Sequence, residues 1–177
     1  IHSSANVVAI AYQMSIFIPP SDVQEVWWTP ILPPALIAVT VSMTIFPLST
    51  GLMVSLDPFC PLEEIDVEFM DRKPNFWALI PLYCDMLMES KRIPEDYDMS
   101  HLRTIGAGAE AMNDRKYAEV EAFFHKHNVK AKFSAGYGQS EGCSNFTLPN
   151  PMFPLEDGCV GMPMPATVLA VFDKDLN

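Results

Sequence analysis

The sequence has few basic residues and none of the clusters with which proteins bind nucleic acid. Eleven lysines and arginines stand against 22 aspartates and glutamates among 177 residues, so the formal net charge is -11. No run of basic residues is longer than a pair. Because binding to nucleic acid depends on neutralising phosphates with lysine and arginine, we expect no nucleic acid partner.

Cysteine is also scarce, and its four copies are scattered. Cys60, Cys84, Cys143 and Cys159 form no C-x-x-C pair, and no histidine stands near them at the spacing of zinc ligands. Two disulfides are possible in a secreted protein, but a domain of this size does not depend on them. We therefore expect reduced thiols and a cytoplasmic location.

A long uninterrupted apolar run is missing as well. The most apolar stretch, residues 31–48, contains Pro33, Pro34 and Pro47, whereas a membrane-spanning helix needs about 20 consecutive apolar residues. We therefore predict no transmembrane segment and a buried helix between prolines. The chain also begins without methionine or a signal peptide, so we expect it to be a piece of a larger protein.

The residues that are present predict a folded domain in which strands and helices alternate. The chain is 49% hydrophobic and 19% charged, a composition typical of globular proteins. Predicted strands lie at 52–57, 76–80, 102–108 and 129–135, and predicted helices at 61–70, 81–90 and 114–127. This alternation predicts an α/β fold that is doubly wound, with a mainly parallel sheet flanked by helices.

Glycine-containing loops follow two neighbouring predicted strands. Gly106, Ala107 and Gly108 end one strand, and the sequence GYGQSEG at 136–142 follows the next. The carboxyl ends of parallel strands share one edge of a sheet, where ligands of open α/β sheets bind. Both loops are therefore expected to line one crevice.

The second loop has the residue types that a nucleotide and its metal require. Gly136 and Gly138 allow the backbone to approach a ligand closely, and Tyr137 offers a flat face to a base. Ser140 offers a hydrogen-bond donor to a phosphate oxygen, and Glu141 offers a carboxylate to Mg²⁺.

Two other interpretations of these loops stay open at this point. GQSEG matches the G-x-S-x-G elbow of serine hydrolases, with Ser140 as nucleophile, but all four histidines precede Ser140 and the elbow order needs one after it. GAGAEA at 106–111 resembles a dinucleotide-binding turn. That turn needs an acidic residue at the end of the next strand, where Ser134, Ala135 and Gly136 stand.

Taken together, the motifs resemble those of the AMP-forming, adenylate-forming enzymes, which include acyl-CoA synthetases, aryl-CoA ligases, luciferases and adenylation domains. GYGQSEG is similar to the family motif G-Y-G-x-[ST]-E. The segments DMSHLRTIGAGAEAM at 98–112 and DGCVGMPMPATVLAVFDKD at 157–175 resemble two further motifs, in the order and spacing of the family. The resemblance covers nearly the whole chain.

The resemblance implies an ATP-dependent ligase that joins a carboxylic acid to AMP and then transfers the acyl group to coenzyme A. In this scheme Tyr137 stacks on adenine, and backbone groups of Gly106, Ala107 and Gly108 line the base and the acyl channel. Ser140 binds phosphate and is not acylated, and Glu141 holds Mg²⁺. The cofactors implied are ATP or AMP, Mg²⁺ and coenzyme A as co-substrate.

The sequence also departs from the family pattern. Ala35 and Leu36 stand in LPPALI where the family commonly has an aromatic residue followed by histidine or tryptophan, and Ala166 replaces a usual glycine. The lysine-bearing phosphate loop of the family does not occur in the chain, and neither does its T-G-D segment. A non-catalytic relative that binds a nucleotide or acyl group is therefore the alternative function.

These absences imply that residues 1–177 are one α/β subdomain of a larger AMP-binding domain. Residues 159–177 would start the connection to the following β subdomain. Alone, such a chain is expected to be inactive. The apolar stretch 7–18, which would pack on the rest of the parent chain, is expected to lie partly uncovered and to favour self-association.

Overall fold

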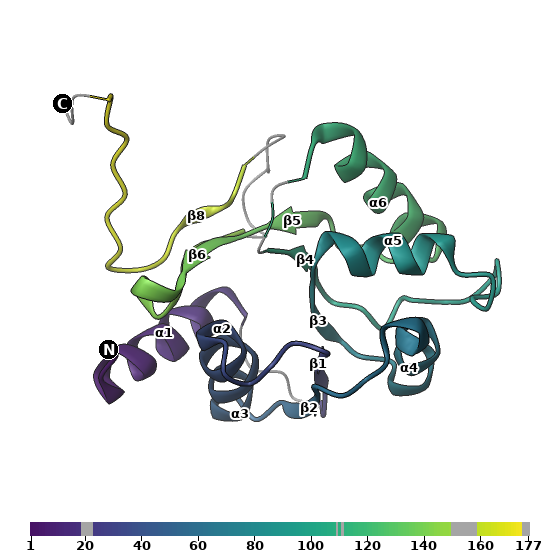
Figure 1. Cartoon of the computed structure of the whole chain (residues 1–177), viewed down its shortest axis with the longest axis horizontal. Coiled ribbons are helices and arrows are strands. Elements are labelled where there is room, and N and C mark those ends of the chain that lie inside the picture. The colour runs from purple at the N-terminus through teal and green to yellow at the C-terminus, as the bar shows by residue number, and fades with distance from the viewer. Residues whose placement is uncertain (19–22, 109, 111, 150–158, 175–177) are drawn as a thin grey trace.

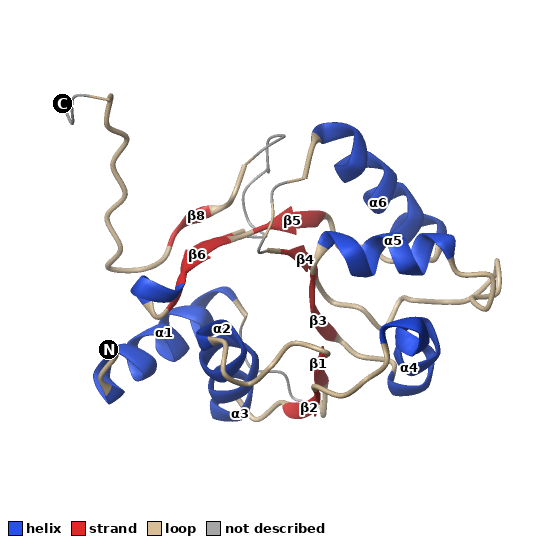
Figure 2. Cartoon of the chain, in the orientation of Figure 1, coloured by secondary structure: helices blue, strands red, loops and turns tan. Residues whose placement is uncertain are grey.

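The main sheet of the protein has five parallel strands. The computed structural model describes residues 1–18, 23–108, 110, 112–149 and 159–174. The strands lie in the order β2-β1-β3-β4-β5, and every neighbouring pair is parallel (Figures 1 and 2). They are β1 (Val26–Pro30), β2 (Met53–Asp57), β3 (Phe76–Leu79), β4 (Ile105–Ala107) and β5 (Phe133–Ala135). The predicted α/β fold with a parallel sheet is confirmed.

Helices cover both faces of this sheet. On one face lie α4 (Ile65–Arg72), α5 (Pro81–Glu89) and α6 (Asp114–Lys126), and on the other lie α1 (Ser4–Phe17), α2 (Ile37–Thr40) and α3 (Phe46–Ser49) (Figure 1). The three predicted helices are confirmed, the first beginning with the short 3-10 turn η2 (Leu62–Glu64). Asn113 caps α6, since its side chain accepts a hydrogen bond from the Lys116 N–H.

The strand β1, which lies between β2 and β3 in the interior of the sheet, was not expected from the sequence. Trp27 and Trp28 are both buried, 6% and 0% exposed, and they belong to the hydrophobic cores on opposite faces of the sheet. A strand that is buried on both faces has no alternation of apolar and polar residues. The two-residue period that indicates a strand in a sequence is therefore missing.

Two predicted strands are shorter than expected, and of the segment 102–108 only Ile105–Ala107 forms β4. Only Phe133–Ala135 of the segment 129–135 pairs with β4. The N–H of Val129 instead donates to the carbonyl oxygen of Phe124 at 3.0 Å, at the end of α6. Residues 129–132 thus finish the helix end rather than begin the strand.

The predicted buried helix between prolines extends from α2 to α3 and contains a wide turn. Between the two α segments lies a π-helical segment, η1 (Val41–Ile45). Pro47 follows within α3 and has no N–H to donate, and its ring crowds the carbonyl four residues earlier, that of Met43. Met43 lies in the π-helical segment, whose turn is wider than that of an α-helix. This wider turn leaves room for the proline ring.

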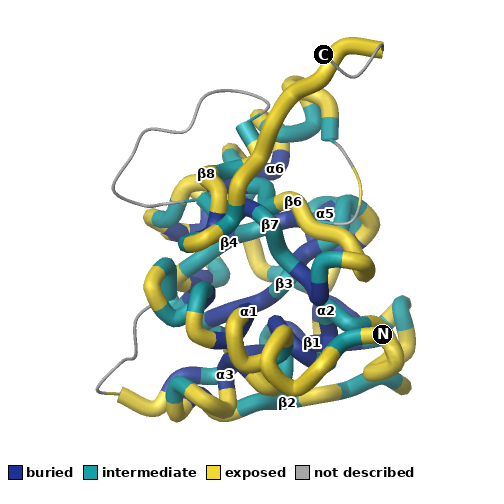
Figure 3. The backbone as a smooth tube through the Cα atoms, turned by 90° about the vertical axis from the view of Figure 1, so that its left-hand side faces the viewer, coloured by how far each residue is buried: buried dark blue, intermediate teal, exposed yellow. Residues whose placement is uncertain are grey.

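A second, antiparallel sheet follows the main one. It consists of β6 (Tyr137–Gln139), β7 (Ser144–Leu148) and β8 (Met162–Pro163), with the turn η3 (Ser140–Gly142) between β6 and β7. Ala109 and Ala111 of the GAGAEA motif and residues 150–158, including Pro151 and Pro154, lie outside the described residues. Of the predicted connecting segment the structure describes residues 159–174, and Val168–Lys174 are exposed (Figure 3).

The apolar stretch 7–18 forms most of α1 and has one uncovered side. Ile10, Ala11 and Met14 are buried, whereas Val8, Tyr12 and Ile16 are 64%, 69% and 54% exposed. Their spacing of four residues places these three side chains along one stripe of the helix. The expected exposure of this stretch is therefore observed, while self-association stays a prediction.

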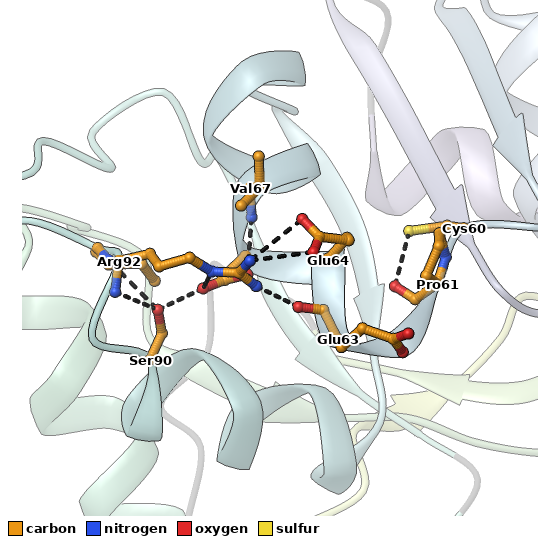
Figure 4. Close-up of polar contacts among 9 residues, drawn as sticks. Cys60, Pro61, Glu63, Glu64, Val67, Ser90 and Arg92 are labelled. Carbon is orange, nitrogen blue, oxygen red and sulfur yellow. Dashed lines mark hydrogen bonds and ion pairs between the residues drawn. The ribbon is translucent and has the colours of Figure 1, made fainter.

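Charged residues hold α4 to the loop after α5. Asp66, in α4, is 4% exposed and accepts hydrogen bonds from Arg92 and from the hydroxyl of Ser90. The Arg92 guanidinium also donates to the Glu64 carboxylate, at 3.2 Å, and to the carbonyl of Glu63 (Figure 4). Burial alone raises the pKa of Asp66, but the bonds from Arg92, Ser90 and the Val67 N–H outweigh burial and lower that pKa below its usual value.

We expect Asp66→Asn to destabilise the protein at neutral pH by about 1–3 kcal/mol, because it removes charged hydrogen bonds from a buried group. A carboxyl group with a lowered pKa stabilises the fold above the unfolded pKa of about 4, and this contribution is lost as the pH falls through the folded pKa. The difference in free energy of unfolding from wild type should therefore shrink below pH 4 in urea titrations. Asp71→Asn, at an exposed position of the same helix, is the control and should change little at any pH; a pH-independent effect of Asp66→Asn would contradict this explanation.

Candidate functional site

A cavity of about 640 Å³ lies beside the main sheet. Ala78, Gly106 and Ser134 pair with one another across β3, β4 and β5 and line this cavity. They fall on the face of the sheet that carries Trp27 and Phe76, because alternate residues of a strand share a face. Since all three side chains are small or absent, the sheet leaves open space where larger residues would fill it.

The opposite walls of the cavity come from α1, the π segment and β7. Met14 and Phe17 of α1, Ser42 and Met43 of η1, and Asn145 and Leu148 of β7 line it. Most of these groups are apolar. The exceptions, Ser42 and Asn145, are hydrogen-bonded to each other at 3.3 Å, and Ser42 also bonds to the buried hydroxyl of Ser144. These polar residues were not expected from the sequence, because they lie about a hundred residues apart.

One end of the cavity meets the two glycine-containing loops. Gly106, Ala107, Gly108 and Gly136 all line it. The Gly108 N–H donates to the carbonyl of Leu79 at 3.1 Å, and the Gly136 N–H donates to the carbonyl of Ala107 at 3.3 Å. These bonds place both loops at the carboxyl ends of neighbouring strands, as the alternating pattern predicted.

Tyr137, Gly138, Ser140 and Glu141 lie beyond this end, outside the cavity lining. Tyr137 is 41% exposed, and its ring lies 5.7 Å from that of Phe146, centroid to centroid. Its N–H donates to the hydroxyl of Thr147 at 3.0 Å. One face of the ring is thus supported by protein while a large part of the ring stays accessible to a ligand.

Ser140 and Glu141 are exposed in the turn η3. Neither side chain makes a hydrogen bond or ion pair with any residue that the structure describes. The carbonyl of Ser140 is 2.6 Å from Nε2 of His2, which precedes α1, so this turn lies beside the amino end of that helix. A helix amino terminus favours an anion such as phosphate. The role of His2 was missed, because it stands 138 positions from Ser140.

The arrangement does not support the serine hydrolase interpretation. The nitrogen of His2 contacts the main-chain oxygen of Ser140 and not its hydroxyl, and within the described part of the chain no histidine bonds that hydroxyl. A nucleophilic serine needs an adjacent base to accept its proton. The dinucleotide interpretation also weakens, because α6 begins only at Asp114, several residues after the glycines that should open it.

The cysteines and the metal-binding side chains of the described residues do not form a second site. All four cysteines are free thiols, as predicted from their scatter. Burial and the neighbouring Asp57 and Glu68 raise the pKa of Cys60 to about 11, and burial raises that of Cys84 to about 12, so neither is a thiolate at neutral pH (Figure 4 shows Cys60). The described residues contain no group of three metal-binding side chains, and no helix among them is long and apolar enough to cross a membrane.

Comparison with protein families decides between the remaining interpretations. The model of the AMP-binding enzyme family matches residues 1–177. The chain belongs to the AMP-binding enzyme family. The resemblance of its three motifs is thereby confirmed, although a search of curated proteins finds no significant match.

Solved structures share the fold of this family member at low sequence identity. A benzoate CoA ligase from Burkholderia xenovorans LB400 is 18% identical, with a TM-score of 0.81 over 99% of this chain and 35% of its own. The anthranilate CoA ligase AuaEII, solved with anthranoyl-AMP, is 17% identical, with a TM-score of 0.79 over 99% of this chain and 33% of its own. O-succinylbenzoate coenzyme A synthetase from Bacillus subtilis, solved with ATP and magnesium ion, is 17% identical, with a TM-score of 0.68 over 92% of this chain and 32% of its own. The chain thus spans about a third of the length of these enzymes.

In this AMP-binding family member, Gly138 is required by a close backbone approach. A Cβ atom added there would lie 2.1 Å from the carbonyl oxygen of Ser144 and 2.8 Å from Cα of Asn145, both backbone atoms of β7. At Gly108 an added Cβ atom would meet nothing within 4 Å. The two glycines therefore have different reasons to be present.

We expect Gly138→Ala to lower the free energy of unfolding by about 1–3 kcal/mol or more, because β6 and β7 must separate to admit the methyl group. Gly108→Ala is the matched control and should stay within about 0.5 kcal/mol of wild type. Urea unfolding of both variants measures the difference. Equal stability of the two variants would show that β6 and β7 do not pack as described.

Proposed function

We propose that this chain is part of an ATP-dependent ligase that activates a carboxylic acid as an acyl-adenylate and transfers the acyl group to coenzyme A. The observation that carries the proposal is the match of the AMP-binding enzyme family over residues 1–177. The cavity supports it, because its volume lies in the range of about 300–1,000 Å³ of small-molecule sites. Gly136, which lines the cavity, is followed in the chain by the exposed residue Tyr137.

In the proposed arrangement the acyl part of the substrate lies in the cavity and its carboxylate lies at the glycine end. A carboxylate oxygen attacks the α-phosphorus of ATP, and the bond from that phosphorus to pyrophosphate breaks. The sulfur of coenzyme A then attacks the acyl carbon, and AMP leaves. Neither step needs a nucleophile from the protein, only positioning and compensation of negative charge.

The nucleotide would lie along the exposed side of β6 and η3. Tyr137 stacks on the adenine ring, and the backbone of Gly106, Ala107 and Gly108 lines its other side. The hydroxyl of Ser140 donates to a phosphate oxygen. Support for this placement comes from the exposed hydroxyl and from the amino end of α1, which lies beside the same turn through His2.

Glu141 fits the binding of Mg²⁺ to ATP. Mg²⁺ is usually held by one or two carboxylates together with phosphates and water, not by a cage of protein ligands. The exposed carboxylate of Glu141, which bonds to no described residue, agrees with that mode. The ion would compensate the negative charge of the phosphates.

We further propose that residues 1–177 form one α/β subdomain of a larger cytoplasmic enzyme, with residues 159–177 leading to the next subdomain. The remainder of that enzyme would cover the exposed stripe of Val8, Tyr12 and Ile16. The chain alone would then be inactive, because it holds only part of the ATP site. Acyl-CoA formation by residues 1–177 alone would contradict this assignment.

The first experiment is ATP–pyrophosphate exchange by the full-length enzyme with short, long, branched and aromatic carboxylic acids. We expect one class of acid to stimulate exchange. Glu141→Ala should lower the rate of exchange by about a hundredfold or more, because compensation of phosphate charge by a metal ion is worth several kcal/mol. Glu95→Ala, at another exposed glutamate in a loop, is the control and should leave exchange unchanged.

Exchange unaffected by Glu141→Ala would remove this residue from the site. A folded enzyme that exchanges with no acid would instead favour a non-catalytic relative that binds a nucleotide or acyl group.

Substitution of Tyr137 tests the position of adenine separately. Loss of a stacking side chain costs about 1–3 kcal/mol per base, so Tyr137→Ala should raise KM for ATP by about tenfold or more while KM for the acid changes little. Tyr137→Phe keeps the ring but loses the hydrogen bond that Tyr137 accepts from Gln139, and it should behave nearly as wild type. Equal KM values for ATP in both variants would place adenine elsewhere.

A further inference from the structure

The end of the cavity away from the two glycine loops is lined by positively charged residues. Arg103 precedes β4, and Lys130 and Lys132 precede β5, and all three line the cavity. Because β4 and β5 are parallel neighbours, these residues lie at the amino ends of strands whose carboxyl ends lead to Gly108 and Gly136. The cavity thus has a glycine end and a basic end.

This charge is unusual for the protein. The chain has 22 acidic and 11 basic residues, yet within its described part no aspartate or glutamate lines the cavity. The charged residues among the lining are Arg103, Lys130 and Lys132. A cavity lined by one sign of charge attracts a ligand of the opposite sign.

Arg103 is held in place, whereas the two lysines are not. Nη1 of Arg103 donates to Oε2 of the buried Glu25 at 2.6 Å, and the guanidinium lies 5.5 Å from the centre of the Phe76 ring. Neither lysine forms an ion pair or hydrogen bond with a described residue. The Glu25 carboxylate balances the charge of Arg103, so the charges of both lysines remain uncompensated at this end.

The distance between the two ends suits a substrate with a charge at each. Residues 103–108 contain β4 (Ile105–Ala107) and span at most about 16 Å, at ~3.3 Å per residue when extended. Between the ends the walls are largely apolar, with Met14, Phe17, Trp27 and Met43. An apolar chain fits between these walls, and burial of a charge in that middle region would be costly.

We propose that the carboxylic acid activated by this protein carries a second carboxylate at its far end, so that the substrate is a long-chain α,ω-dicarboxylic acid. This inference rests on the proposed function. One carboxylate lies at the glycine end and reacts, and the other lies between Lys130 and Lys132, with Arg103 beside them. Both lysines are exposed, so the far carboxylate keeps part of its hydration and gains their attraction.

The test compares pairs of acids of equal length in pyrophosphate exchange by the full-length enzyme. The diacids are adipic, suberic, sebacic, dodecanedioic and tetradecanedioic acid, and the monoacids are the corresponding unbranched fatty acids. We expect the best diacid to have a kcat/KM at least about tenfold above that of its matched monoacid, which corresponds to about 1.4 kcal/mol. High salt should reduce this preference, because it screens charges near the surface.

A double variant, Lys130→Met with Lys132→Met, should remove most of the preference through a higher KM for the diacid, with exchange of the monoacid unchanged. Lys91→Met with Lys126→Met removes the same charge from exposed positions outside the cavity and should keep the preference. Equal or better use of monoacids by the wild type would overturn the inference while leaving the proposed function intact. A preference that survives the Lys130 and Lys132 double variant would overturn it as well.

The two proposals can also fail separately. If the folded enzyme exchanges with no acid, the proposed function fails. Calorimetric titration of the same protein with tetradecanedioic and tetradecanoic acid then decides the inference. Tighter binding of the diacid that the lysine double variant abolishes would support it, and any other result would overturn it.

Discussion

Every other part of the fold is arranged around β1, an interior strand of the sheet that is buried on both faces. Its two tryptophans enter the cores on both sides: Trp27 stacks on Phe76 at 5.5 Å, and Trp28 lies 4.9 Å from Trp77. Replacing a buried tryptophan by alanine typically costs about 3–5 kcal/mol. None of the three indole N–H groups has a partner among the described residues, a cost of about 1–3 kcal/mol each, so ring burial must outweigh the lost hydrogen bonds.

The cavity exists because large aromatic side chains cover this face of the sheet only as far as Phe76 in β3. On the face of the sheet that holds Trp27 and Phe76, the next positions along the sheet are Ala78, Gly106 and Ser134, which cannot fill the space under α1 and η1. Interiors of proteins are otherwise packed as densely as organic crystals. A row of small residues opposite apolar helices therefore leaves room for a ligand without loss of the core on the other face.

The strand order would place the ligand elsewhere. In a sheet of order 2-1-3-4-5 the crevice is expected at the carboxyl ends of β1 and β3, where the chain changes direction. The hydroxyl of the buried Tyr83 there donates to the carbonyl of Pro30 at 3.2 Å. Ile31, the next residue, has a φ of 64°, a strained conformation for a β-branched side chain. The buried Tyr83 thus lies at this point, whereas the loops that line the cavity, with Gly108 and Gly136, follow β4 and β5.

The amino-acid order alone was enough to predict the α/β class, three of the sheet-facing helices, four of the five main strands and the glycine loops at the ends of β4 and β5. These features can be predicted from short stretches of sequence, because helix periodicity, proline positions and glycine pairs depend on residues that are close together in the chain. Only the three-dimensional packing placed β1 between β2 and β3, because a strand that is buried on both faces lacks the alternation of apolar and polar residues that marks a strand in a sequence. It also decided that His2 lies beside Ser140, that Ser42 meets Asn145, and that Lys130 and Lys132 share a cavity with Gly108. Such contacts join residues far apart in the chain, and only the packing of strands and helices brings their side chains together.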